Sequence, residues 1–254
     1  MTTTNARADD DAAADADPHD APSGAPAGDA PAKPPTRVVL VRHAVTAHTG
    51  PLLSGRMPGI ALSDKGVEQA EATARRLANV PIDAIYASPI ERTTQTAQAI
   101  AQHHDLDVIP LDGVIEAEYG DWTGGKISDL AKTDEWKVVQ VAPSRARFPG
   151  GESIREMQSR MVGALDALVA AHPHETIVVV SHADPIKSAI AHYAGMHLDL
   201  FQRVHVSPAS VTVLEFHSFG VLLVKCNDTG GLDELVPPPA AEPATAEAPA
   251  EVAQ

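Results

Sequence analysis

The chain has 254 residues, a net charge of −15 and one cysteine. One cysteine excludes an intrachain disulfide and a zinc site built from several cysteines. The acidic balance, with no stripe of lysine and arginine, disfavours binding to nucleic acid or to an anionic membrane. No apolar run approaches the roughly 20 residues that cross a membrane, and no signal-peptide pattern opens the chain, so we expect a cytoplasmic protein.

The two ends of the chain differ in composition from its middle. Residues 1–35 and 237–254 consist mainly of Ala, Asp, Glu and Pro. Such segments bury too little apolar surface to offset the entropy lost on ordering. We therefore expect two disordered tails flanking one folded domain, residues 36–236.

Within this domain, short β-branched runs alternate with longer stretches of helical periodicity. Strands are expected at residues 38–41, 82–88, 107–111, 176–182, 210–216 and 220–226, and helices at 64–78, 91–104, 153–171 and 184–195. The alternation predicts a three-layer α/β/α sandwich with a mainly parallel sheet, and the last two strands predict an antiparallel hairpin. Residues 51–60 and 124–148 are expected to be loops that contact substrate.

Two helix starts carry recognisable signals. Ser63 is a candidate N-cap for the helix at residues 64–78, and Ser153 with Glu156 has the spacing of a capping box. Glu152, in "FPGGES", is expected to support this second helix start. The apolar face of the first helix is expected to contain Val67, Ala70, Ala74 and Leu77.

Arginine and histidine follow three of the predicted strands. Arg42 and His43 end the first strand in "VVLVRHAVTAHTG", Arg92 follows the second in "YASPIERTTQTA", and His182 ends the strand in "VVVSHADPIK". Taken alone, each has a common structural role at a strand end. Because parallel strands end at one edge of a sheet, together they predict a pocket for a phosphoryl group, whose oxygens suit arginine forks and helix N-termini.

Five motifs occur in order along the chain: "LVRHAVTAHT", "SPIERTTQTA", "EAEYGDWTGG", "FPGGES" and "VVSHADPIK". Over residues 37–230 the chain resembles the histidine phosphatase superfamily, in the branch of cofactor-dependent phosphoglycerate mutases and broad-specificity phosphatases. Within it the chain is most similar to an actinobacterial group described as phosphomutases or phosphatases. The resemblance implies the phosphoglycerate mutase-like form of the three-layer sandwich.

The resemblance also implies roles for single residues. His43 matches the nucleophile that becomes phosphorylated, and three residues match those that hold the phosphoryl oxygens: Arg42, Arg92 and His182. Glu116 matches the acid that protonates the leaving oxygen. From the residues alone, two neighbouring carboxylates are equal candidates for this acid: Glu118 and Asp121.

The chain departs from the family pattern beside the motif histidines. Ala44 and Ala183 replace the usual glycines, Val45 replaces a glutamate, and Thr49 replaces an asparagine. The last two changes affect substrate contacts rather than phosphoryl chemistry. Thr49, and Arg56 on a loop near the expected pocket mouth, are candidate substrate contacts.

The leading hypothesis is a phosphomonoester hydrolase that acts on a small phosphorylated metabolite through a phosphohistidine. It needs no metal or cofactor, because arginine and histidine stabilise the phosphoryl charge and the histidine spacing fits no zinc pattern. A phosphomutase, which passes the phosphoryl group to a second hydroxyl, is the alternative, and a silent phosphate-binding module is a third. We expect a small phosphate ester as the partner, no nucleic acid, no membrane, and a monomer or homodimer.

Overall fold

The computed structural model describes residues 33–230. Nearly all of the two expected tails, residues 1–35 and 237–254, and the last six residues of the expected domain lie outside this part of the chain.

A six-stranded mixed sheet forms the centre of the domain, with the strand order β3-β2-β4-β1-β5-β6. The strands are β1 (Thr36–Arg42), β2 (Ala84–Ala87), β3 (Val108–Pro110), β4 (Thr176–Ser181), β5 (Val211–His217) and β6 (Gly220–Asp228). The first four strands run parallel: β1 pairs with β4, β4 with β2, and β2 with β3. β5 runs antiparallel to both β1 and β6. The mainly parallel sheet and the terminal hairpin are confirmed.

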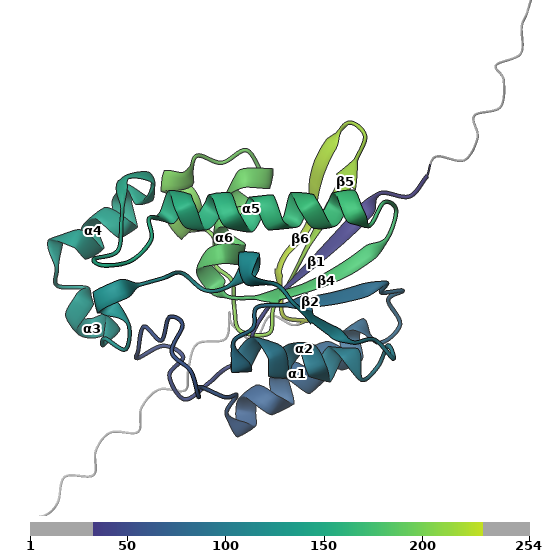
Figure 1. Cartoon of the computed structure of the whole chain (residues 1–254), viewed down its shortest axis with the longest axis horizontal. Helices are drawn as coiled ribbons and strands as arrows, with labels where there is room; N and C mark the ends of the chain where they lie inside the picture. The colour runs from purple at the N-terminus through teal and green to yellow at the C-terminus, as the bar shows by residue number, and fades with distance from the viewer. Residues whose placement is uncertain (1–32, 231–254) are drawn as a thin grey trace, which may run out of the picture. The chain divides into compact units, whose positions relative to one another are not determined.

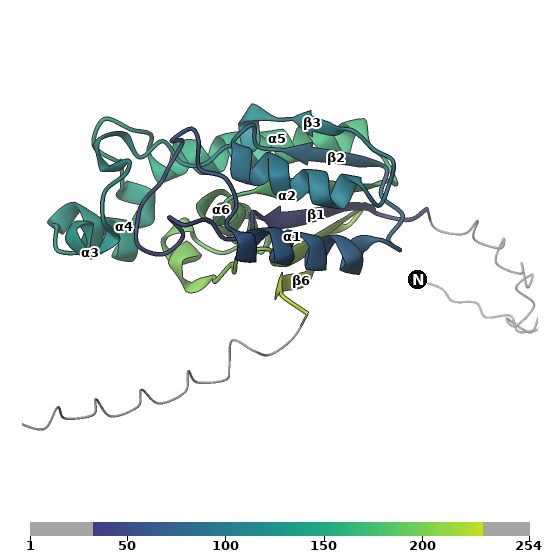
Figure 2. The ribbon, with the colours of Figure 1, turned by 90° about the horizontal axis from the view of Figure 1, so that it is seen from below.

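Helices cover both faces of this sheet. α5 (Ile154–Ala171) and α6 (Ala183–Tyr193) lie on one face, and α1 (Asp64–Leu77) and α2 (Glu91–Ala101) lie on the other, as Figures 1 and 2 show. Alternate residues of β1 enter different cores: Val38 and Leu40 pack on the α5–α6 side, and Val39 and Val41 on the α1–α2 side. β1 is therefore buried on both faces, which explains its continuous aliphatic run.

Both predicted helix starts are present. The Ser63 side chain accepts a hydrogen bond from the Gly66 amide, and Ser153 and Glu156 form a capping box. The predicted face of α1 is wrong in one position, because Val67 is 47% exposed. Gly66 faces inward instead, since α1 packs so closely on the Val45 carbonyl that a side chain at residue 66 would collide with it.

The segment expected as a loop at residues 124–148 is largely helical. It contains α3 (Ile127–Leu130) and α4 (Asp134–Val141), and the Thr133 side chain caps α4 by accepting from the Trp136 amide. β1 runs toward the end of the domain where α3 and α4 lie (Figure 2). Four short 3₁₀ segments complete the described structure: η1 (Asp112–Val114), η2 (Gly120–Trp122), η3 (Pro143–Arg145) and η4 (Leu198–Arg203). Across residues 33–230, no helix has both the length and the apolar character that crossing a membrane requires.

Candidate active site

The strand order brings the predicted arginine and histidine residues together. β4 lies between β2 and β1, so the side chains that follow these three strands meet at one edge of the sheet. The rings of His43 and His182 are 5.2 Å apart. Arg92 lies between them: its Nε donates to His43 Nε2 at 3.2 Å, and its Nη2 is 3.1 Å from His182 Nδ1.

His43 has the chemical state of a nucleophile. Its Nδ1 lies 2.8 Å from the Ala44 carbonyl, to which only a protonated nitrogen can donate, so the lone pair is on Nε2. Burial, together with the charges of Arg92 and Arg42, holds the pKa of the imidazole well below its usual range. The ring is therefore neutral near pH 7, and attack requires the Nε2 lone pair to exchange its hydrogen bond from Arg92 Nε for the phosphorus atom.

Two guanidinium groups provide positive charge beside Nε2. Arg42 Nη1 donates to the Val206 carbonyl at 2.6 Å, and Arg92 Nη2 donates to the Gly55 carbonyl at 2.8 Å. Within the described residues, Arg42 Nε and Arg92 Nη1 are buried without a hydrogen-bond partner. Burial lowers the pKa of both arginines, yet a guanidinium stays protonated in proteins. Unpaired buried donors on two cations suit a multiply charged oxyanion.

His182 lies behind these groups and is completely buried. Its Nε2 is 2.8 Å from Ser88 Oγ, and burial with the charge of Arg92 keeps its pKa well below the usual value. Since Nδ1 accepts from Arg92, the ring donates to Ser88 and orients the Arg92 guanidinium. His182 does not line the cleft in this arrangement, so its direct contact with a phosphoryl group stays a prediction.

Glu116 is the one of the three candidate acids that lines the cleft. Its side chain accepts from the Ala117 amide at 2.9 Å, and its Oε2 lies 3.7 Å from His182 Nδ1. Burial, reinforced by the nearby charge of Asp184, raises the pKa of Glu116 to about 7. Glu118, by contrast, turns outward to an ion pair with Arg56, and Asp121 is exposed.

A partly buried ionic network holds the backbone that carries Glu116. Arg160, on α5, donates to the carbonyls of residues 113, 115 and 116 at 2.6–3.0 Å. Arg56 Nε donates to the Glu116 carbonyl at 2.8 Å, and Glu152 pairs with both arginines. Arg56, expected near the pocket mouth, thus lies behind Glu116 and does not line the cleft. Its predicted contact with substrate finds no support in this geometry.

Glycines allow the motif around Glu116 to pack on the "FPGGES" motif. Gly120 has a φ of +55°, and a side chain there would collide with the Pro149 carbonyl. Gly151 approaches the Glu118 carbonyl equally closely. The two motifs, which begin at residues 116 and 148, therefore pack closely against each other behind the acid.

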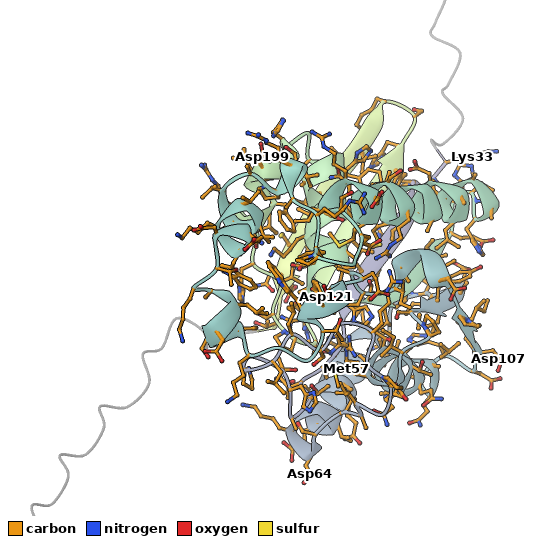
Figure 3. All side chains as sticks on the ribbon, turned by 60° about the vertical axis from the view of Figure 1, so that its left-hand side comes forward. Lys33, Met57, Asp64, Asp107, Asp121 and Asp199 are labelled. Carbon is orange, nitrogen blue, oxygen red and sulfur yellow. The ribbon has the colours of Figure 1, made fainter. Side chains whose placement is uncertain are left out.

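The cleft in front of these residues has a volume of about 340 Å³, more than a phosphoryl group occupies. Thr49 lines it, as expected, and its hydroxyl lies 3.1 Å from that of Thr46. The loop after β1 forms one side of the cleft. A hydrogen bond from the Leu53 amide to the Gly125 carbonyl holds this loop to the segment around η2. Met57 and Asp121, on these two stretches, lie on the same face of the domain in Figure 3.

Two polar residues of the cleft were not singled out from the sequence. Asp184, on the first turn of α6, accepts from the Tyr119 hydroxyl at 3.0 Å and pairs with Lys187 at 3.2 Å. Burial and the charge of Asp184 raise the pKa of Tyr119 well above its ordinary value, so the phenol stays a donor. Both residues lie inside the motifs that carry Glu116 and His182, but only tertiary structure shows that they touch.

Across residues 33–230, no group of three or more His, Cys, Asp or Glu side chains is arranged to hold a metal ion.

Comparisons with known proteins agree with this geometry. A model of the histidine phosphatase superfamily (branch 1) matches residues 38–229. Phosphoserine phosphatase 1 of Hydrogenobacter thermophilus is 32% identical over 203 residues, which cover 78% of this chain and 95% of that protein. The Bifunctional protein Rv2228c of Mycobacterium tuberculosis is 32% identical over 87% of this chain, and the match spans 63% of its length. The structure of phosphoserine phosphatase from Entamoeba histolytica, in complex with 3-phosphoglyceric acid, superimposes with a TM-score of 0.71 at 26% identity, covering 77% of this chain and 98% of that one.

Proposed function

The chain belongs to the histidine phosphatase superfamily, and we propose that it hydrolyses phosphate monoesters of small metabolites through a phosphorylated His43. Relatives named as phosphoserine phosphatases support a phosphate ester as the substrate. The observation that carries the proposal is the neutral His43, its Nε2 lone pair facing two guanidinium groups with unpaired buried donors.

The first step transfers the phosphoryl group to the enzyme. Arg42 and Arg92 bind the phosphoryl oxygens, and His43 Nε2 attacks phosphorus while the bond to the ester oxygen breaks. The Glu116 carboxyl gives its proton to the departing oxygen. The proton on His43 Nδ1 stays there, hydrogen-bonded to the Ala44 carbonyl. Apart from the bond to His43, the protein contributes mainly by positioning the reacting groups and by stabilising the phosphoryl charge.

The second step releases phosphate. The Glu116 carboxylate takes a proton from water as the water oxygen attacks phosphorus, the bond to Nε2 breaks, and the lone pair returns to His43. A pKa of about 7 suits Glu116 to both steps, since the group donates and accepts with similar ease near neutral pH.

A phosphomutase would use the same residues and differ only in the acceptor, a second hydroxyl in place of water. The products separate the two reactions: a hydrolase releases inorganic phosphate in proportion to the alcohol, and a mutase returns an isomeric phosphate ester.

The His43→Ala variant tests the proposal. We expect it to abolish both turnover and the acid-labile phosphoenzyme, because His182, the other neutral imidazole in contact with Arg92, does not line the cleft. Trapping with radiolabelled ester in EDTA measures both, and activity should persist in the wild-type protein because the proposed site uses no metal. The exposed His192 on α6 provides the matched control, since His192→Ala should retain the label. A phosphoenzyme that survives in His43→Ala, or wild-type activity that EDTA abolishes and a divalent ion restores, would contradict the mechanism.

The proposal includes a cytoplasmic location and a monomeric or homodimeric state. Fractionation of cells that express the full chain tests the first, and light scattering of the purified protein tests the second.

A further inference from the structure

Given the proposed ester hydrolysis, on which this inference rests, the part of the cleft away from His43 receives the leaving alcohol. That part has an apolar wall, formed by Leu52, Leu53, Ile127, Trp136 and Val139. The wall comes from residues 52–53 of the loop after β1 and from α3 and α4, and none of these residues is proposed for phosphoryl transfer.

Helix α4 presents a flat surface to the cleft. Trp136, Val139 and Gln140 all line it, which is the spacing of one helix face. The Trp136 ring is half-buried and lies 5.8 Å from the ring of Trp122, which in turn contacts Phe148 at 5.7 Å. This backing by aromatic rings restricts Trp136, so its surface is available without a large ordering cost.

Charge is distributed unevenly along the cleft. Of the described residues that line it, the only arginines or lysines are Arg42 and Arg92, both beside His43. Asp184 also lines the cleft and adds a carboxylate. Lys187, which pairs with Asp184 at 3.2 Å, does not line the cleft: its Nζ also donates to Gln202 at 2.5 Å and lies over the Phe201 ring.

We propose that the cleft selects phosphate monoesters of uncharged alcohols that bear an aromatic or other apolar group, and that Asp184 rejects alcohols that carry a carboxylate. An apolar group gains by covering the wall around Trp136. A carboxylate on the alcohol would leave water on entering the cleft, find no lining arginine or lysine other than the two that hold the phosphoryl group, and share the cleft with the like charge of Asp184.

Equilibrium binding to the full-length His43→Ala protein tests this selection without turnover. The probes are 2-phenylethyl phosphate, racemic glycerol 3-phosphate and racemic 3-phosphoglycerate, of which the last two differ only in a hydroxymethyl group against a carboxylate. We expect 2-phenylethyl phosphate to bind best, and 3-phosphoglycerate to bind about 10-fold more weakly than glycerol 3-phosphate, as for an unpaired buried charge. Calorimetry measures the three dissociation constants.

Variants assign the two effects to their residues in the same background. Asp184→Asn removes the repelling charge, so the preference for glycerol 3-phosphate over 3-phosphoglycerate should shrink about 5-fold. Trp136→Ala should reduce the preference for 2-phenylethyl phosphate over glycerol 3-phosphate about 10-fold. Val141→Ala, on the exposed side of α4, is the control and should leave both ratios unchanged.

Tighter binding of 3-phosphoglycerate than of glycerol 3-phosphate would overturn the inference, as would equal binding of the two or no binding of any probe. A wild-type protein that turns over none of these esters, while the variant binds them in the expected order, would overturn the proposed hydrolysis and leave the selection standing.

Discussion

At the scale of single residues, Glu116 shows how the site obtains a carboxyl that is protonated near neutral pH. The buried position disfavours the carboxylate, and Asp184 adds a like charge, while Arg92, Arg42 and the Ala117 amide act in the opposite direction. Burial is the largest of these influences, so the pKa rises to about 7 although two cations lie nearby. An acid in this range can protonate an alkoxide.

Replacement of this acid should depend on the leaving group. We expect Glu116→Gln to slow single-turnover phosphoryl transfer from 2-phenylethyl phosphate by about 10²-fold, in the usual range for general acids. Transfer from para-nitrophenyl phosphate, whose leaving group is already a stable anion, should fall far less. The matched variant Glu118→Gln removes a carboxyl that turns away from the cleft and should change neither rate by much. Equal losses on both substrates would instead indicate that Glu116 only positions the ester.

The dependence of the single-turnover rate on pH tests the role of Glu116 as an acid independently. Above pH 7 the wild-type Glu116 loses the proton it must donate, so the rate with the alkyl ester should fall about tenfold per pH unit. The nitrophenyl ester should lack this alkaline limb, and Glu116→Gln should lack it with both esters. Ionisation of the substrate phosphate, near pH 6, affects both esters alike and cancels in the comparison.

At the scale of elements, the sequence predicted what local patterns encode. The aliphatic run of residues 38–41 predicted a strand buried on both sides, and the Ser153 capping box correctly placed the start of α5. The helix α4 was missed because its inward face is narrow, with Trp136 and Val139 between exposed residues such as Val138 and Val141. Short helices of this kind are stabilised by the walls they cover rather than by their own periodicity.

For the candidate site too, the sequence predicted what local patterns encode and missed what depends on tertiary contacts. Arg42, His43, Arg92 and His182 follow strands, and the rule that parallel strands end at one edge was enough to bring them together. The pairing of Tyr119 with Asp184, and the position of Arg56 behind Glu116, depend on how separate loops fold against each other. No spacing of residues in the sequence predicts those contacts.

Helix α5 holds the acid-bearing segment through one side chain, Arg160. Arg160→Met should remove hydrogen bonds to three carbonyls and leave Glu152 poorly compensated, lowering the free energy of unfolding by about 2–3 kcal/mol. Because Glu116 loses its support, single-turnover transfer from the alkyl ester should fall more than transfer from the nitrophenyl ester. Denaturant titration and the two rates measure these effects.

The control for this prediction lies on the same helix. Arg155 donates to the Ser144 carbonyl in η3, a segment that carries no residue proposed for catalysis. Arg155→Met should therefore cost stability without changing the ratio of alkyl to nitrophenyl rates. If Arg160→Met also leaves this ratio unchanged, the network supports the fold but does not position the acid.

At the scale of the whole molecule, every residue proposed for catalysis or substrate selection lies between Arg42 and Asp184, and both core layers lie within the described residues. The strand order β2-β4-β1 places the site at the sheet edge where α/β proteins bind ligands. The hairpin of β5 and β6 completes the sheet on one side and adds Val213 and Leu214 to the two cores. We therefore expect the domain alone to be sufficient for the proposed chemistry.

Removal of both ends of the chain tests whether the domain is sufficient. Residues 1–35 and 237–254 consist largely of Ala, Asp, Glu and Pro, so we expect a fragment of residues 36–236 to keep its stability and activity. Its melting temperature should stay within about 2 °C of that of the full chain, which corresponds to less than 1 kcal/mol for a domain of this size. Calorimetry and the steady-state kcat/KM for para-nitrophenyl phosphate provide the two measurements. A larger fall in either would assign a packing or binding role to one end, and fragments that lack only residues 1–35 or only residues 237–254 would identify which.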